Sequence, residues 1–163
     1  MGDDGAGIAV LEALRSLALP QTVRLVDGGT DASTLARLWD GEPLVVLVDA
    51  LARGYDPGTL TVLDRLALRE LAVNQPHVHA LALPACVEWV FLAEPRLGEA
   101  TVVLVGIEPA TVAPTHALSP AVAAAIPQAV RTVLGLLGLP NQAGQEPPRP
   151  TKTQDKRSSS EPA

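Results

Sequence analysis

The sequence has one cysteine, few aromatic residues and no long apolar run. Because Cys86 is the single cysteine, the chain cannot form an internal disulfide or a zinc site made of several cysteines. Aromatic residues make up 2% of the chain, which argues against binding of nucleic acid by base stacking. No apolar run approaches the roughly 20 residues that span a membrane, and the first residues lack the basic and apolar parts of a signal peptide. We therefore expect a cytoplasmic protein with no membrane partner.

Positive charge is also scarce before the last part of the chain. The formal net charge is -6. The segment from residue 140 onward holds four basic and three acidic residues, so the part before it carries about -7. This charge repels the phosphates of nucleic acids and of anionic lipids. No nucleic acid partner is expected.

The apolar content is high enough for a folded domain. The 163 residues are 47% apolar, which suffices for one domain with a buried core. With so few aromatics, that core must consist of Leu, Val, Ile and Ala, as in sheets covered by helices. From residue 140 the chain is rich in Pro, Gln, Lys, Ser and Glu. We predict a domain over 1–139 and a disordered tail over 140–163.

Several segments have the spacing or the end signals of helices. Ser119 and Pro120 are typical of an N-cap and a first helical position, and Pro127 then falls inside the helix, where we expect a bend or the start of its main segment. The segment 65–76 is ambiguous. The predicted helices are Gly5–Leu19, ended by Pro20, one through Leu35 and Leu38 to Trp39, Ala80–Leu92, and Ser119 to about Leu137.

Short β-branched or continuously apolar runs predict strands between these helices. Leu44–Val48 is apolar without alternation, which indicates a strand covered on both faces. The other predicted strands are Thr22–Val26, Thr59–Leu63, nearer the sheet edge, and Thr101–Val105. Strands that alternate with helices predict an α/β fold: a three-layer helix-sheet-helix sandwich around a twisted, mostly parallel sheet.

Acidic residues follow the predicted strands at the ends where such sheets bind ligands. Asp49 comes directly after the apolar run of its strand, and Asp27 follows the run that ends at Val26. Asp3 and Asp4 lie in a glycine-rich turn before the first helix, where the backbone can direct a carboxylate into a cleft. These acidic loops could converge on one rim of the sheet.

Each acidic residue also has a purely structural interpretation. Asp3 and Asp4 would suit the dipole at a helix start. Asp49 could cap the following turn through backbone N–H groups, although a carboxylate after buried residues calls for a cation or a hydrogen-bond donor. The Asp27-Gly28-Gly29 segment is also ordinary turn chemistry.

Histidine could complete a metal site. Two carboxylates and one imidazole form an open site for a first-row divalent metal. The candidates are His77, His79 and His116, and spacing does not choose among them. Cys86 is interpreted as core packing.

Short motifs spread over most of residues 2 to 130 resemble, in the same order, those of the hydrogenase maturation endopeptidases. Singly these motifs are weak, but seven in order are specific. They are Gly2-Asp3-Asp4-Gly5-Ala6-Gly7-Ile8, Leu25-Val26-Asp27-Gly28-Gly29-Thr30, Val46-Leu47-Val48-Asp49-Ala50, Pro57-Gly58-Thr59, His79-Ala80-Leu81-Ala82-Leu83, Leu104-Val105-Gly106-Ile107-Glu108-Pro109 and Leu118-Ser119-Pro120-Ala121-Val122.

The resemblance implies an activity, a partner and a metal. It implies an endopeptidase, described as aspartic-type, that removes the C-terminal extension of a nickel-iron hydrogenase large-subunit precursor after nickel insertion. Nickel, supplied by the precursor, would be contacted by Asp4, Asp49 and His79, with His77 as the fallback ligand. Residues 27–30, namely Asp27, Gly28, Gly29 and Thr30, match a segment linked to substrate recognition.

The chain departs from the family pattern at three places. Ala32 and Ala82 stand where glycine is usual. Family members also carry a hydrophobic strand and a Gly-x-Gly-Asn turn before the Gly-Asp-Asp segment. We therefore expect a misassigned start codon or a truncated sequence, since losing a central strand leaves unpaired backbone groups.

Two other functions fit parts of the pattern. A degenerate relative could bind the precursor without cleaving it. A receiver-type phosphoacceptor domain also places acidic residues after strands, but it needs a lysine near its last strand. Both lysines here, Lys152 and Lys156, lie in the predicted tail, which disfavours a receiver.

Overall fold

The computed structural model describes residues 2–30, 34–74, 83–111 and 117–140. Within them, three strands form a mixed sheet in the order β1-β3-β2. Strand β3 pairs in parallel with β1 and antiparallel with β2. The strands are β1, Leu44–Ala50, β2, Leu60–Asp64, and β3, Thr101–Ile107.

Helices precede, connect and follow these strands. Helix α5 begins with the predicted cap, since Ser119 Oγ accepts a hydrogen bond from the Val122 N–H at 3.4 Å and Pro120 is the first helical residue. Pro127 lies inside the helix, as predicted. The helical elements are η1, Gly2–Gly5, α1, Ala6–Arg15, α2, Leu35–Leu38, α3, Arg65–Asn74, α4, Leu83–Ala93, η3, Pro95–Glu99, and α5, Pro120–Leu136.

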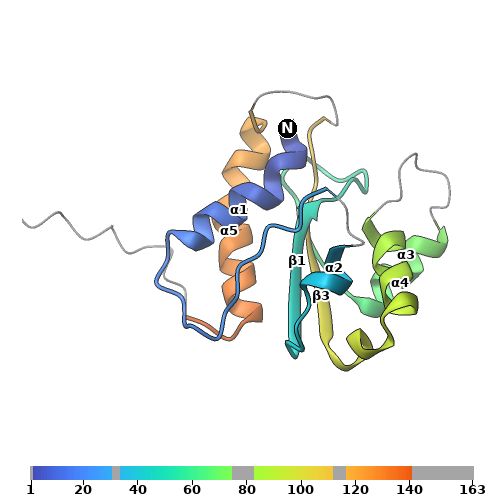
Figure 1. The fold of residues 1–163 in the computed structure, drawn as a ribbon. Helices are drawn as coiled ribbons and strands as arrows, with labels where there is room; N and C mark the ends of the chain where they lie inside the picture. The colour runs from blue at the N-terminus through green and yellow to red at the C-terminus, as the bar shows by residue number, and fades with distance from the viewer. Residues whose placement is uncertain (1, 31–33, 75–82, 112–116, 141–163) are drawn as a thin grey trace, which may run out of the picture.

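The helices cover both faces of the sheet, with α1 and α5 on one side and α3 and α4 on the other (Figure 1). Alternate side chains of β1 enter two separate apolar cores, as expected for a strand covered on both faces. Val46 and Val48 pack against the core that contains α1 and α5. Val45 and Leu47 pack against the core that contains α3 and α4. The predicted α/β architecture with helices on both faces is confirmed.

The sheet is mixed, so the prediction of a mostly parallel sheet holds for the pair of β1 and β3 and not for the pair of β2 and β3. Strand β2 lies at the sheet edge, as expected, but it runs antiparallel to β3. A short connection over 51–59 returns the chain into the same sheet, which suits a strand of opposite direction. The ambiguous segment 65–76 forms helix α3 over its described part.

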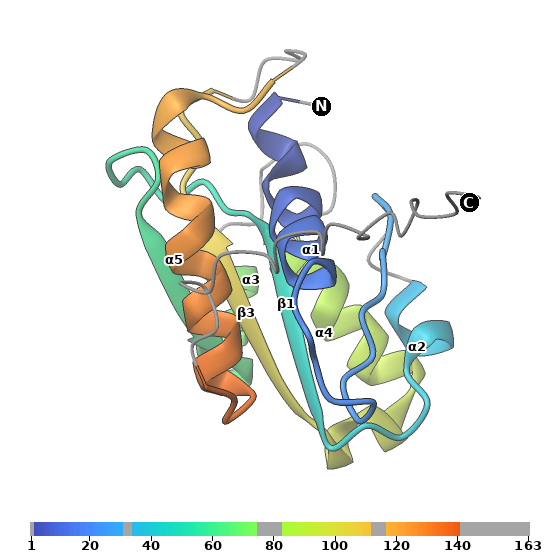
Figure 2. The same ribbon diagram turned by 90° about the vertical axis from the view of Figure 1, so that its left-hand side faces the viewer.

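The predicted strand over Thr22–Val26 is wrong. This segment runs on the same side of the molecule as β1 in both views (Figures 1 and 2), yet it pairs with no strand in the part of the chain that the structure describes. The Val23 N–H donates locally to the Pro20 carbonyl at 2.9 Å, and Arg24 Nε donates to Glu42 at 2.7 Å. Local and side-chain contacts therefore take the place of a backbone ladder.

No helix in the described ranges is both long and apolar enough to cross a membrane. The first residues of the predicted helix Ala80–Leu92 lie outside those ranges, as does nearly all of the predicted tail.

Candidate functional site

Asp49 lies near the carboxyl end of β1, where the sequence predicted a functional carboxylate. It pairs in register with Gly106 of β3, and its side chain is partly buried. One carboxylate oxygen accepts a hydrogen bond from the Ala50 N–H at 2.8 Å. This bond agrees in part with the turn-capping interpretation. It uses only one of the several acceptor sites of the carboxylate.

A close contact between α1 and β1 brings the Gly-Asp-Asp turn to this end of the strand. A Cβ atom built on Gly7 would lie 2.5 Å from the Val48 carbonyl oxygen, so only glycine allows the helix to approach so closely. The contact holds η1 beside the end of β1, and the two lie together in Figure 2.

Asp4 and Asp49 are close enough to interact electrostatically. Burial and the nearby charge of Asp4 raise the pKa of Asp49 above its ordinary value, against the opposing effect of the Ala50 N–H. Asp4 is exposed. In the part of the chain that the structure describes, neither carboxylate forms an ion pair with a basic side chain. The pair is thus an uncompensated acidic site of the kind that attracts a cation.

Asp3 has a different role from its neighbour. Its side chain is 1% exposed and accepts hydrogen bonds from the N–H groups of Ser119 at 2.7 Å and Ala110 at 2.8 Å. The Thr111 N–H adds a longer bond at 3.3 Å. Burial acts to raise the pKa of Asp3, but these backbone donors outweigh it and the pKa lies below its ordinary value. Asp3 therefore anchors the backbone after β3 and before α5 beside Asp4.

Glu108 is a second buried anchor whose role the sequence reasoning missed. It follows β3 and is 6% exposed. Its carboxylate accepts hydrogen bonds from the N–H groups of Arg53, at 2.8 and 3.1 Å, and Gly54, at 3.0 Å. These bonds hold the loop that follows Asp49. The only sequence signal was the position of Glu108 within one of the family motifs.

The Asp27 segment adopts the turn that its residues favour. Asp27 is exposed and accepts a hydrogen bond from the Gly29 N–H at 2.9 Å. The Thr34 hydroxyl donates to the Gly28 carbonyl at 3.0 Å. Within the described ranges no hydrogen bond or ion pair joins Asp27 to Asp49, so the convergence of three acidic loops stays a prediction.

All three histidine candidates, His77, His79 and His116, lie outside the described residues, and so does Ala32. Among the residues that are described, no group of three His, Cys, Asp or Glu side chains could hold a metal ion. Cys86 is partly buried on α4. The structure thus brings together two of the three predicted ligands and leaves the third a prediction.

Comparisons with known proteins identify the relatives of this chain. It is 30% identical to the Hydrogenase 2 maturation protease of Escherichia coli over 139 residues, covering 83% of this chain and 82% of that protein. The hydrogenase maturating endopeptidase HybD from E. coli superposes with a TM-score of 0.71 at 27% identity, with 85% of both chains covered. A hydrogenase 2 maturation peptidase from a Thaumarchaeota archaeon gives a TM-score of 0.59 at 30% identity, covering 86% of this chain and 92% of that one. The model of the hydrogenase maturation protease family matches residues 8–136. The chain therefore belongs to the hydrogenase maturation protease family.

Proposed function

We propose that this protein is a cytoplasmic endopeptidase that removes the C-terminal extension of a nickel-iron hydrogenase large-subunit precursor after nickel insertion. One observation carries the proposal: in a chain of this family, the carboxylates of Asp4 and Asp49 interact at the carboxyl end of β1 without a basic partner among the described residues. That arrangement suits recognition of a metal that arrives with the substrate.

The proposed nickel contacts are Asp4, Asp49 and His79, with His77 as the alternative histidine. Two carboxylate oxygens and one imidazole nitrogen are suitable donors for a first-row divalent ion and leave positions open for the precursor's own ligands. Burial, and to a smaller extent the charge of Asp4, raises the pKa of Asp49, and a cation between the two carboxylates would offset both effects. The donor set therefore fits the metal that the precursor would carry.

The reaction is hydrolysis of one peptide bond. Water adds to the scissile carbonyl carbon, the C–N bond breaks, and the released amine takes a proton. Nickel bound to the precursor would fix the position of this bond relative to the carboxylates, which removes much of the entropic barrier to reaction. Asp4 and Asp49 would hold the metal, and the anchors Asp3 and Glu108 would keep the surrounding backbone in place.

Cleavage of a nickel-loaded precursor tests the proposal. Purified protein should shorten the loaded precursor, and Asp49→Asn should abolish the shortening. Asp56→Asn is the matched control, because Asp56 is an exposed aspartate on the loop after β1 and its variant should retain activity. Unchanged cleavage by Asp49→Asn would refute the site. Binding of the precursor without cleavage by the wild-type protein would instead indicate a non-catalytic accessory.

The segment 27–30 is proposed to contact the precursor. Asp27 is exposed in a turn and is followed by Gly28 and Gly29. Gly29 has a φ of 68°. Asp27→Ala should raise KM for the precursor with little change in kcat, as expected when binding is lost uniformly. A fall in kcat at unchanged KM would exclude a recognition role.

A further inference from the structure

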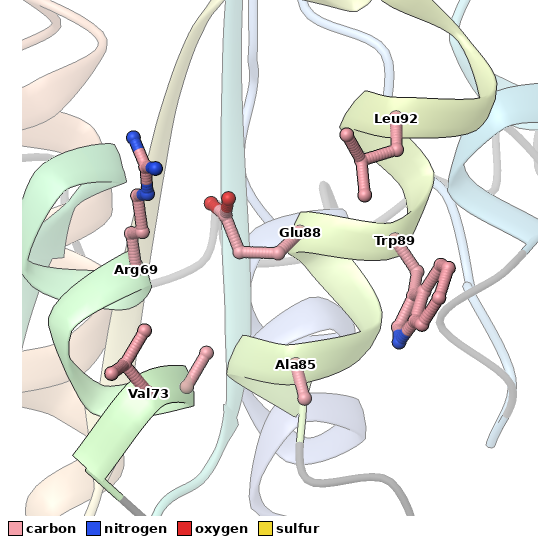
Figure 3. A pocket seen from close by; sticks show the side chains of 7 residues that line it. Arg69, Val73, Ala85, Glu88, Trp89 and Leu92 are labelled. Atoms are coloured by element: carbon pink, nitrogen blue, oxygen red, sulfur yellow. The ribbon is translucent and has the colours of Figure 1, made fainter.

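A groove of about 230 Å³ separates the exposed sides of α3 and α4. Figure 3 shows Arg69 and Val73 on the α3 wall, and Ala85, Glu88, Trp89 and Leu92 on the α4 wall. None of these residues belongs to η1 or β1, which carry the carboxylate pair. The groove is therefore a separate surface feature.

One buried polar atom in this groove has no partner. Glu88 Oε1 is inaccessible to solvent and has no hydrogen-bond donor in the structure as described. The side chain extends from α4 toward α3 (Figure 3). A buried carboxylate oxygen without a donor is unfavourable, because it has lost its water without gaining a hydrogen bond. In the free protein, Glu88 Oε1 thus lacks a hydrogen-bond donor among the described residues.

The walls around Glu88 are apolar and open to solvent. Val73 is 70% exposed, Trp89 65% and Leu92 72%. A cluster of large apolar side chains at the surface is typical of a protein interaction site. Such walls can contact the aliphatic part of a long side chain, and an indole ring also attracts a cation.

Arg69 is the only basic residue among those that line the groove. It is exposed at the rim, and no ion pair within 4.0 Å joins it to Glu88 among the described residues. A charge at the rim is screened by water, whereas a charge at a buried atom interacts more strongly. Glu88 therefore dominates the selectivity inside the groove.

We propose that this groove binds a short apolar segment of a partner protein that carries a lysine or arginine. The charged group donates to the carboxylate of Glu88, which lines the groove, and the apolar side chains of the segment cover Val73, Trp89 and Leu92. The charge complementarity with Glu88 selects a basic segment over a neutral or acidic one.

Three acetylated tripeptide amides test this inference: Leu-Lys-Leu, Leu-norleucine-Leu and Leu-Glu-Leu. Binding is followed by the NMR signal of the Trp89 indole N–H, assigned with Trp89→Phe. Trp39, the second tryptophan, serves as an internal reference because its indole N–H donates to the Glu42 carbonyl at 2.9 Å. The lysine peptide should bind at least about tenfold more tightly than the norleucine peptide, as expected for a charge-assisted hydrogen bond.

Glu88→Gln should remove this preference for lysine. The matched control is Glu70→Gln, which removes the same charge from an exposed position on α3 that does not line the groove and should keep the preference. The change from lysine to norleucine examines the same contact without altering the protein, so the test does not depend on the stability of one variant.

Several results would overturn the proposal. Equal affinity for the lysine and norleucine peptides would remove the role of Glu88, and a preference for the glutamate peptide would assign the groove to Arg69. Self-association of the protein that perturbs Trp89 would make a second copy the occupant. Binding to phosphatidylcholine–phosphatidylglycerol vesicles in place of the peptides would make the groove a membrane contact.

Discussion

The ionised carboxylate of Asp49 is less favourable in the folded protein than in the unfolded chain. Burial and the charge of Asp4 raise the pKa of Asp49. Ionised Asp49 therefore destabilises the fold above its folded pKa, and this penalty disappears as the pH falls toward its ordinary value of 3.8. Residues that lower stability in this way are often retained for function.

Asp49→Asn should stabilise the protein at neutral pH while abolishing precursor cleavage. We expect a gain on the order of 1 kcal/mol in the free energy of unfolding, a usual size for relief of an unfavourable site charge. Urea unfolding measured from about pH 8 down to about pH 4 should show the gain shrinking as the pH falls through the raised pKa. A variant less stable than wild type at neutral pH would contradict this electrostatic account.

Asp3 should behave in the opposite way. Asp3→Ala leaves three backbone N–H groups without their buried acceptor, and we expect a loss of about 3 kcal/mol in the free energy of unfolding. Because the pKa of Asp3 is lowered, its contribution is present above its ordinary value of 3.8 and is lost as the pH falls through the depressed pKa. Asp27→Ala is the control, since that exposed aspartate accepts a backbone hydrogen bond from the Gly29 N–H. Equal losses in both variants, measured by urea unfolding at neutral pH, would show that burial of Asp3 is unimportant.

At the scale of secondary-structure elements, the close packing of α1 against β1 determines the position of Asp4. In Gly7→Ala the new Cβ would meet the Val48 carbonyl oxygen at 2.5 Å, and relief requires movement of backbone. We expect a loss of about 2 kcal/mol in stability, as for other overpacked contacts. Cleavage should fall as well, because α1 and η1 would move away from Asp49.

Gly135→Ala provides the comparison for this element contact. Gly135 also lies within a helix, but nothing in the described structure lies within 4 Å of its added Cβ. That variant should gain about 0.5–1 kcal/mol, because alanine favours the helix over glycine. Thermal unfolding of the two variants checks both signs. A tolerated Gly7→Ala would mean that the contact between α1 and β1 is not tight in solution.

For the whole molecule, metal binding should appear as a change in global stability. A ligand that binds only the folded state at 100 times its Kd adds about 2.7 kcal/mol, which raises Tm by roughly 5–10 °C in a domain of this size. We expect Ni²⁺ to raise the Tm of the wild-type protein and a chelator to reverse the rise. Asp4→Asn and Asp49→Asn should lose this response, and Asp56→Asn should keep it. A similar rise in all variants would place the metal elsewhere.

At the level of single elements, local signals were sufficient in some places and not in others. The run Leu44–Val48 predicted β1 and its covered faces, and Ser119-Pro120 predicted the start of α5. Thr22–Val26 has strand-forming residues but no strand partner among the described residues. A propensity describes the chain alone, whereas a strand also needs a neighbour to receive its backbone hydrogen bonds.

Across the molecule, the sequence by itself determined the α/β class, the family and the carboxylate at the end of β1, because periodicity and motif order are written along the chain. Only the tertiary structure decided the direction of β2 and the separate roles of Asp3 and Asp4. It also decided the anchoring role of Glu108. The backbone groups bound by Asp3 lie 107 to 116 residues away, and those bound by Glu108 lie 54 or 55 residues away. Such bonds form only when folding brings distant segments together, so no local pattern of residues can predict them.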